Sequence, residues 1–156
     1  MPNNPALIGE GITALFASSR LPRQKLRIAE EVFRGAGEIL WVKKEGDLDT
    51  VTGLSGSGPA YLYRFVHALS QAGEKLGLPA SLAHRLALKT ALGSALTLQH
   101  TGKMPSELIP LVSSKKGTTL AGLKVLDRKK FNGIIHETVR AATRRAREMR
   151  KELRKR

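Results

Sequence analysis

Two short segments combine glycine with hydroxyl side chains and could bind a small anion. The first spans residues 54–61, LSGSGPAY. Its glycines let the backbone approach another group closely, and exposed N–H groups and hydroxyls near a helix start could bind a carboxylate or phosphate. The alternative is that this loop only turns the chain and caps a helix. Its candidate binding residues are Ser55, Gly56, Ser57, Gly58 and Pro59.

The second segment spans residues 112–119, VSSKKGTT. Gly117 frees the backbone, and the helix expected to follow directs its positive end at the segment. This pattern predicts a cradle for a small anion, with an ordinary helix cap and two surface lysines as the alternative. The hydroxyl donors are Ser113, Ser114, Thr118 and Thr119.

Several other kinds of site are excluded by the sequence. The chain has no cysteine, so disulfides, thiolate metal sites and a cysteine nucleophile are absent. The four histidines show no metal-ligand spacing, and no metal site is predicted. The sequence contains no G-x-S-x-G motif, no P-loop and no G-x-G-x-x-G after a strand, so it carries at most half of an active site and no dinucleotide fingerprint.

Residues 1–45 are predicted to form a strand, a helix and a second strand. The apolar residues 11–17 favour an extended segment, helical spacing begins at Pro22, and residues 38–42, EILWV, are typical of a strand. Two strands with one helix are a poor independent unit because their edges need partners. We therefore interpret residues 1–45 as a remnant of the end of a larger nucleotide-binding domain.

Residues 46–156 are predicted to be helical almost throughout and to form an all-helical dimerisation and substrate-binding domain, which makes the fold mainly α. Proline and glycine mark the helix ends, as expected from their backbone preferences. Aromatic residues make up only 4% of the chain, which favours closely packed helices of Ala, Leu, Ile and Val. The predicted helices run from Pro59 to Gly77, Pro79 to Gly102, Met104 to Val112, Thr118 to Leu126 and Phe131 to Leu153.

The last predicted helix indicates a dimer. Its apolar stripe is about six turns long, and the chain offers few other long helices to cover it. We expect the stripe to pack against a second subunit, giving a helical bundle in an intertwined homodimer.

The formal charge of +14 is concentrated near the C-terminus. Residues 140–156 carry nine bases and two acids, and residues 115–130 carry six bases and one acid. A solvated helix face explains such a pattern, because cations near a helix C-terminus are favourable. Polyanion binding through residues 140–156 is the alternative, although no aromatic residues lie between the arginines to stack on bases.

Neither a membrane span nor a leader is predicted. No apolar run approaches about 18 residues, and the chain does not open with a basic, apolar and small-residue pattern. We expect a soluble, cytoplasmic protein.

The order and spacing of several motifs resemble the pyrroline-5-carboxylate reductase family. These motifs are MPNNPALIGEGITAL, GEILWV, VTGLSGSGPAY, LGLP and VSSKKGTTLAGLKVL, and together they cover nearly the whole chain. The resemblance implies an N-terminal Rossmann domain that binds NAD(P)H and an all-helical C-terminal domain that dimerises, with rings of dimers in some members. This chain would then hold the last strands of the Rossmann domain, and the rest of that domain would be supplied in cis or in trans.

The resemblance also implies an activity and roles for the site residues. The family reduces 1-pyrroline-5-carboxylate to L-proline, the last step of proline biosynthesis, with hydride from the nicotinamide. Thr119 matches the threonine near the substrate nitrogen, and Asn3 matches a position near the nicotinamide. The residues expected to hold or line the substrate are Ser113, Ser114, Gly117 and Thr118 of the second segment and Ser55 to Pro59 of the first.

The second segment departs from the family pattern. Where the family usually reads SPGGTT, this sequence has SKKGTT, and the usual acidic residue is missing from residues 108–112. A lysine at a position that requires positive φ would cost about 1–2 kcal/mol. Two functions therefore remain open: the substrate-binding and dimerisation part of the reductase, expected to be inactive alone, or a non-catalytic basic dimeric module that binds RNA or another polyanion.

Overall fold

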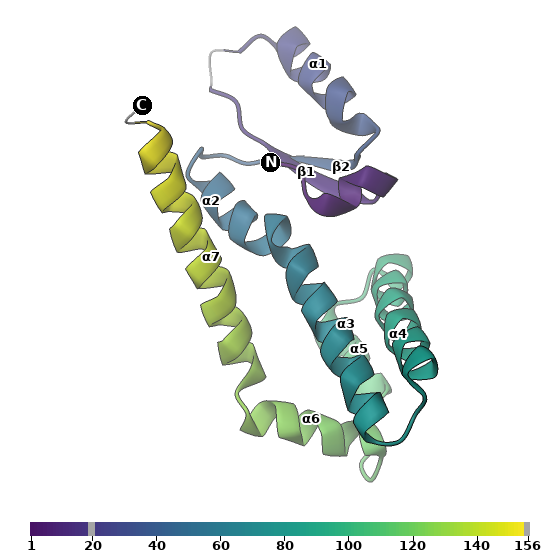
Figure 1. Ribbon diagram of the computed structural model, residues 1–156. Helices are drawn as coiled ribbons and strands as arrows, with labels where there is room; N and C mark the ends of the chain where they lie inside the picture. Colours follow the sequence, from purple (N-terminus) through teal and green to yellow (C-terminus); the bar gives the residue numbers. More distant parts are fainter. Residues whose placement is uncertain (19–20, 155–156) are drawn as a thin grey trace. The chain divides into compact units, whose positions relative to one another are not determined.

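The computed structural model describes residues 1–18 and 21–154, so Lys155 and Arg156 of the predicted basic tail lie outside it. It divides into two compact units, residues 1–61 with 135–156 and residues 62–134. Most described residues are helical, and the strands lie near the N-terminus, which confirms the mainly α fold (Figure 1). No helix in the described ranges combines the length and apolarity needed to cross a membrane.

The N-terminal segment forms the predicted strand, helix and strand. A short 3-10 helix, Asn4–Ile8, precedes β1 (Gly11–Leu15), α1 (Arg23–Arg34) and β2 (Gly37–Trp41). The two strands are parallel, in a register from Gly11 opposite Gly37 to Leu15 opposite Trp41. Gly37 has a φ of 124°, and a Cβ there would lie 2.6 Å from the Gly11 nitrogen, so only glycine fits this close strand approach.

Three helical segments follow one another almost without a break after β2. They are α2 (Asp47–Val51), a π-helical turn (Thr52–Gly56) and α3 (Gly58–Lys75). Helix α2 was not predicted from the sequence, and a loop was predicted before the helix that starts at Pro59. The π-helical bond from the Ser57 N–H to the Thr52 carbonyl, at 2.8 Å, carries the helix through the glycines.

The long helix α7 (Phe131–Leu153) packs closely against this π-helical turn. Gly53 is buried, and a Cβ on it would lie 2.9 Å from both the Thr143 nitrogen and the Val139 oxygen. Thr143 is itself only 8% exposed. A side chain at position 53 would therefore have to push two helices apart.

An ion pair joins α2 to α7 near the end of that contact. Arg150 donates from Nε to Asp49 Oδ1 at 3.1 Å and from Nη2 to Asp49 Oδ2 at 2.9 Å. The Asp49 side chain is 6% exposed, so these bonds replace the hydrogen bonds that water would make to its oxygens. The hydrogen bonds and charge of Asp49 raise the pKa of Arg150. Because the pKa of Arg150 is raised in the folded state, the stabilisation from its ion pair is fully present below the ordinary arginine pKa. This stabilisation therefore stays constant through neutral pH.

Removing the arginine that pairs with the buried Asp49 is expected to destabilise the protein more than removing the arginine of an exposed pair. Arg150→Ala leaves the Asp49 carboxylate buried without its main partner, and the midpoint of thermal unfolding should fall by several degrees. Arg154→Ala is the matched control, because Arg154 pairs with the exposed Glu45 and exposed pairs contribute little. Circular dichroism measures both midpoints, and equal midpoints for the two variants would contradict the prediction.

Residues 62–134 hold most of α3 and three further helices, α4 (Ala80–Thr101), α5 (Pro105–Leu111) and α6 (Thr118–Arg128). Their ends follow the sequence signals closely. Pro79 is the N-cap of α4, and Gly102 ends it in the left-handed conformation with φ 63°. Glu107 accepts the Met104 N–H at 2.7 Å at the start of α5.

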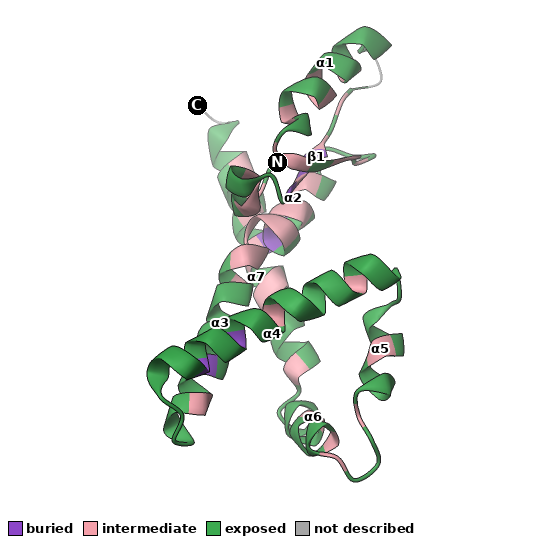
Figure 2. Ribbon diagram, turned by 90° about the vertical axis from the view of Figure 1, so that its right-hand side faces the viewer, coloured by how far each residue is buried: buried purple, intermediate pink, exposed green. Residues whose placement is uncertain are grey.

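Little of this second unit is buried. Its buried residues among those described are Ser70, Ala83 and Ala87, where α3 and α4 touch. A Cβ on Gly73 would lie 3.1 Å from the Ala83 Cβ, which shows how closely these two helices approach. Most of α3 and α4 is coloured as exposed in Figure 2. The exposed residues of these helices include the large apolar Phe65, Leu86 and Leu92.

Candidate functional site

The first candidate segment is part of a helix, which corrects the predicted loop. Ser55 and Gly56 belong to the π-helical turn, Ser57 follows it, and Gly58 and Pro59 begin α3. The Ser57 N–H, expected to be exposed, is bonded to Thr52. The backbone of this segment stays helical, and none of its glycines has a positive φ. Gly56 and the neighbouring Gly53 instead permit close packing.

Hydroxyl groups compensate for the irregular hydrogen bonding of this turn. Ser55 donates its hydroxyl to the Val51 carbonyl at 3.1 Å, and Thr52 donates to the Leu48 carbonyl at 2.7 Å. The Tyr61 hydroxyl donates to the Gly53 carbonyl at 3.2 Å. This role of Tyr61 was not predicted, although its position two residues after Pro59 was visible in the sequence. Of the two candidate serines, Ser57 is therefore the better donor to a ligand.

The N-terminal segment lies against the same turn. A Cβ on Gly56 would lie 2.6 Å from the Met1 Cε, so Met1 covers this glycine. Asn3 is two residues away, and its Oδ1 accepts the Ile12 N–H at 3.0 Å. That bond fixes the Asn3 side chain beside β1 and leaves its NH₂ donors outside the bond. Asn3 and the first candidate segment thus belong to one unit.

The second candidate segment is a tight turn between α5 and α6. The Gly117 N–H bonds to the Ser114 carbonyl at 3.0 Å, and Gly117 is the N-cap of α6 with a φ of −83°. Of the described residues other than glycine, Lys130 alone has a positive φ. Lys115 and Lys116 therefore replace the family's usual proline and glycine without the strain considered above.

Ser113 is less available to bind a ligand than the sequence suggests. Its hydroxyl donates to the Ile109 carbonyl at 2.7 Å, and its N–H points to the Pro110 carbonyl at 3.4 Å. Both donors thus satisfy carbonyls at the C-terminal end of α5, which lack helical partners of their own. Sequence alone did not show this, because a serine four residues after an isoleucine carries no recognisable signal.

The start of α6 presents donors that the helix does not use. The first helical bond at this end is from the Ala121 N–H to the Gly117 carbonyl, at 3.4 Å. The N–H groups of Thr118 and Thr119 therefore lack an intrahelical acceptor, and both residues are exposed. With the positive end of the helix dipole and the exposed Lys115 and Lys116, the turn can hold a carboxylate.

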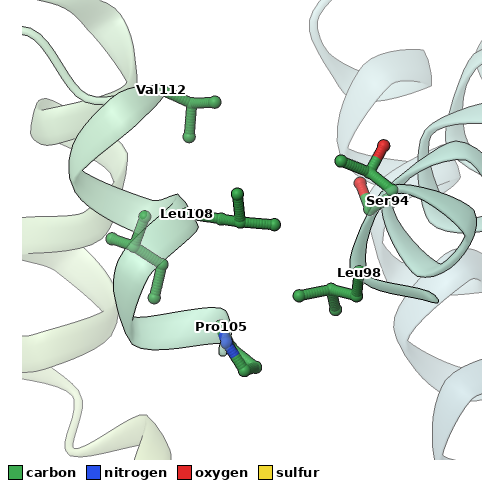
Figure 3. A pocket seen from close by; sticks show the side chains of 7 residues that line it. Ser94, Leu98, Pro105, Leu108 and Val112 are labelled. Carbon is green, nitrogen blue, oxygen red and sulfur yellow. The ribbon is translucent and has the colours of Figure 1, made fainter. Parts of the chain in front are cut away.

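An apolar hollow of about 290 Å³ lies between α4 and α5, just before this turn. Figure 3 shows Leu98 on one side facing Leu108 and Val112 on the other. No charged residue lines it. Such a surface is suited to an apolar side chain of another protein segment. The described residues contain no group of His, Cys, Asp and Glu able to hold a metal ion.

The two candidate segments fall in different units, with residues 55–59 in the first and residues 113–119 in the second. The assignment of these residues to one substrate site stays a prediction.

Comparison with known families gives the site a context. Residues 45–149 match the family model described as pyrroline-5-carboxylate reductase dimerisation. The chain belongs to the pyrroline-5-carboxylate reductase family. This confirms the resemblance drawn from VTGLSGSGPAY and VSSKKGTT, and the matched range contains both segments.

Named relatives and solved structures agree with this membership. The chain is 42% identical to a pyrroline-5-carboxylate reductase of Synechocystis over 149 residues, which are 96% of this chain and 55% of that enzyme. It is 37% identical to the Pseudomonas aeruginosa reductase, covering 98% of this chain and 56% of that one.

The solved reductase structures match over a similar range. The Coxiella burnetii reductase superposes with a TM-score of 0.90 at 35% identity, over 95% of this chain and 55% of that chain. The Plasmodium falciparum reductase, solved with NADP bound, gives a TM-score of 0.88 at 32% identity, over 96% of this chain and 61% of that one. The chain thus spans about half the length of these pyrroline-5-carboxylate reductases.

Proposed function

We propose that this chain is the substrate-binding and dimerisation part of a cytoplasmic pyrroline-5-carboxylate reductase. The reaction is the NAD(P)H-dependent reduction of 1-pyrroline-5-carboxylate to L-proline in proline biosynthesis. The observation that carries the proposal is the start of α6, where the exposed Thr118 and Thr119 have N–H groups without an intrahelical acceptor. This segment lies in the range that the family model matches. Because the chain spans only part of its relatives, the nucleotide-binding part is assigned to the portion of the enzyme outside this sequence.

The substrate carboxylate would bind at the start of α6. The free N–H groups of Thr118 and Thr119 point out of the helix end, and the Ser114 hydroxyl lies one turn before them. Lys115 and Lys116 add positive charge that attracts the carboxylate. Glycine at position 117 leaves room for the Ser114 hydroxyl, since a Cβ there would lie 2.5 Å from the Ser114 Oγ.

Thr119 would act on the substrate ring. Its hydroxyl can donate a hydrogen bond to the ring nitrogen, whose electron density grows when the neighbouring carbon is reduced. The carboxylate bonds fix the ring relative to this hydroxyl, so orientation is the main contribution of the chain. The resemblance also assigns residues 55–59 to substrate binding, and Ser57 is the candidate donor among them.

The proposed contact of this chain with the cofactor is at the nicotinamide end. Asn3, fixed by its bond to the Ile12 N–H, retains amide donors for the nicotinamide end. The sequence has no glycine fingerprint for the pyrophosphate, so the remaining contacts belong to the rest of the enzyme. When bound, NAD(P)H supplies the hydride.

Binding of L-proline to the isolated chain tests the substrate site. We expect the backbone amide signals of residues 114–119 to shift in two-dimensional NMR spectra as millimolar L-proline is added, because the product keeps the carboxylate and the five-membered ring skeleton of the substrate in reduced form. Pyrrolidine, which lacks the carboxylate, is the matched control and should leave these signals in place. Shifts confined to other residues, or equal shifts with pyrrolidine, would overturn the proposed site.

The exposed apolar surface predicts a homodimer. The second unit buries few of its large apolar side chains, and the hollow between α4 and α5 offers room for one from a partner. Sedimentation equilibrium should give an even multiple of 17.0 kDa at micromolar concentration. A single species of 17.0 kDa would contradict the dimer.

A further inference from the structure

The arginines of α7 divide into two groups by their partners. Arg145 pairs with Glu148 and Glu152, at 3.1 Å and 3.0 Å. Arg150 and Arg154 pair with acids of the segment before α3, as described above, and Arg147 lies 3.8 Å from one of these acids, Asp49. By contrast, Arg140 and Arg144 form no ion pair with any residue in the part of the chain that the structure describes.

The unpaired arginines lie around one hollow of about 650 Å³. No acidic residue lines it, and the proposed reductase function does not use it. Its polar lining comes from α7 and from the residue after Asp49, and all of it lies within the first unit. These lining residues are Thr50, His136, Arg140, Thr143, Arg144 and Arg147.

The floor of this hollow is fixed by packing. Thr143 is buried against Gly53, and the Asp49 pair with Arg150 holds α2 to α7 beside Thr50. Arg147 lies 3.8 Å from the same Asp49, too far for a strong hydrogen bond, so its guanidinium can still bind a ligand. A ligand would therefore meet a site whose backbone is already in place, which lowers the entropic cost of binding.

The chemistry of the lining indicates phosphate groups. Guanidinium groups bind phosphate oxygens through paired hydrogen bonds, and the Thr50 hydroxyl adds a donor. Arg140 and Arg147 are separated by about 10 Å along the helix, which favours a chain of phosphates over a single one. No Phe, Tyr or Trp lines the hollow, so it lacks the stacking surfaces used to bind single-stranded nucleic acid.

We propose that this hollow binds a small molecule or ion that carries two or more linked phosphate groups. The proposal does not rest on the reductase function. It gives a role to Arg140, Arg144 and Arg147, three of the nine basic residues in 140–156, which the substrate site does not use.

Isothermal titration of the chain with inorganic tripolyphosphate tests the site. We expect one equivalent to bind per chain, more weakly at 200 mM than at 50 mM salt. The double variant with Arg140→Ala and Arg144→Ala should bind tripolyphosphate at least about tenfold more weakly, because it loses the hydrogen bonds of two charged groups to the phosphates. Both side chains are exposed, and alanine favours the helix, so the variant should fold, with circular dichroism as the check.

The matched control is Arg145→Ala, which removes an arginine of the same helix whose guanidinium is held by Glu148 and Glu152. It should leave tripolyphosphate binding within about twofold of the parent, because this guanidinium lies outside the hollow. Absence of binding, or an equal loss in the control, would overturn the site. Tighter binding of a short single-stranded RNA than of tripolyphosphate, at equal phosphate concentration, would overturn the proposed ligand class.

Discussion

Replacing Gly53 with alanine is expected to lower the free energy of unfolding by about 2 kcal/mol, within the usual range for overpacking. The new Cβ would lie 2.9 Å from the Thr143 nitrogen and from the Val139 oxygen. Both atoms belong to the backbone of α7, so no side-chain rotation relieves the contact. The helical turn that carries Ser55 and precedes Ser57 would have to move away from α7, and urea unfolding followed by circular dichroism would measure the loss.

Gly46→Ala is the control for this substitution. Gly46 has a φ of −63° and no atom within 4 Å of a Cβ placed on it. Alanine there should leave the free energy of unfolding unchanged or raise it by about 0.5 kcal/mol, through the reduced freedom of the unfolded chain. If Gly53→Ala were as stable as Gly46→Ala, the close contact between the π-helical turn and α7 would be wrong.

Thr119→Val is expected to reduce kcat/KM about 100-fold in a complete enzyme built on this chain, the effect of losing one well-placed donor to a developing charge. Valine keeps the size and branching of threonine and removes only the hydroxyl. The backbone N–H that would bind the carboxylate remains, so the loss should fall mainly on kcat. Steady-state oxidation of NADPH with 1-pyrroline-5-carboxylate provides both constants.

Thr101→Val serves as the matched control for the loss of a threonine hydroxyl. Thr101 is exposed at the end of α4, and its hydroxyl donates to the Thr97 carbonyl of the same helix at 2.7 Å. Its kcat/KM should stay within about twofold of the parent, since it touches neither candidate segment. Equal activity of Thr119→Val and the parent would remove Thr119 from the proposed mechanism.

The order and ends of most elements could be predicted because their signals are local. Pro79 and Gly102 bound α4 in the structure as the sequence predicts, and the run EILWV forms most of β2. Proline restricts φ and glycine permits the left-handed conformation whatever lies around them. These residues therefore mark helix ends without knowledge of the tertiary contacts.

The segment around Gly53 and Gly56 was predicted wrongly because its glycines have a different purpose. They allow α7 and Met1 to approach the backbone closely, and the chain stays helical through them. The pair of Asp49 with Arg150 was also missed, since the two residues are 101 positions apart and nothing in either neighbourhood indicates the other. The roles of Ser114 and Thr119 depend on a bound substrate and stay predictions.

The most direct test joins the N-terminal part of the Synechocystis relative, which lies ahead of the matched region, to Met1 of this chain. Absorbance at 340 nm follows the oxidation of NADPH when 1-pyrroline-5-carboxylate is added. We expect steady turnover with L-proline as the product, and no turnover from the present chain alone. A folded, dimeric fusion that binds NADPH but forms no L-proline would contradict the claim that this chain provides the substrate site.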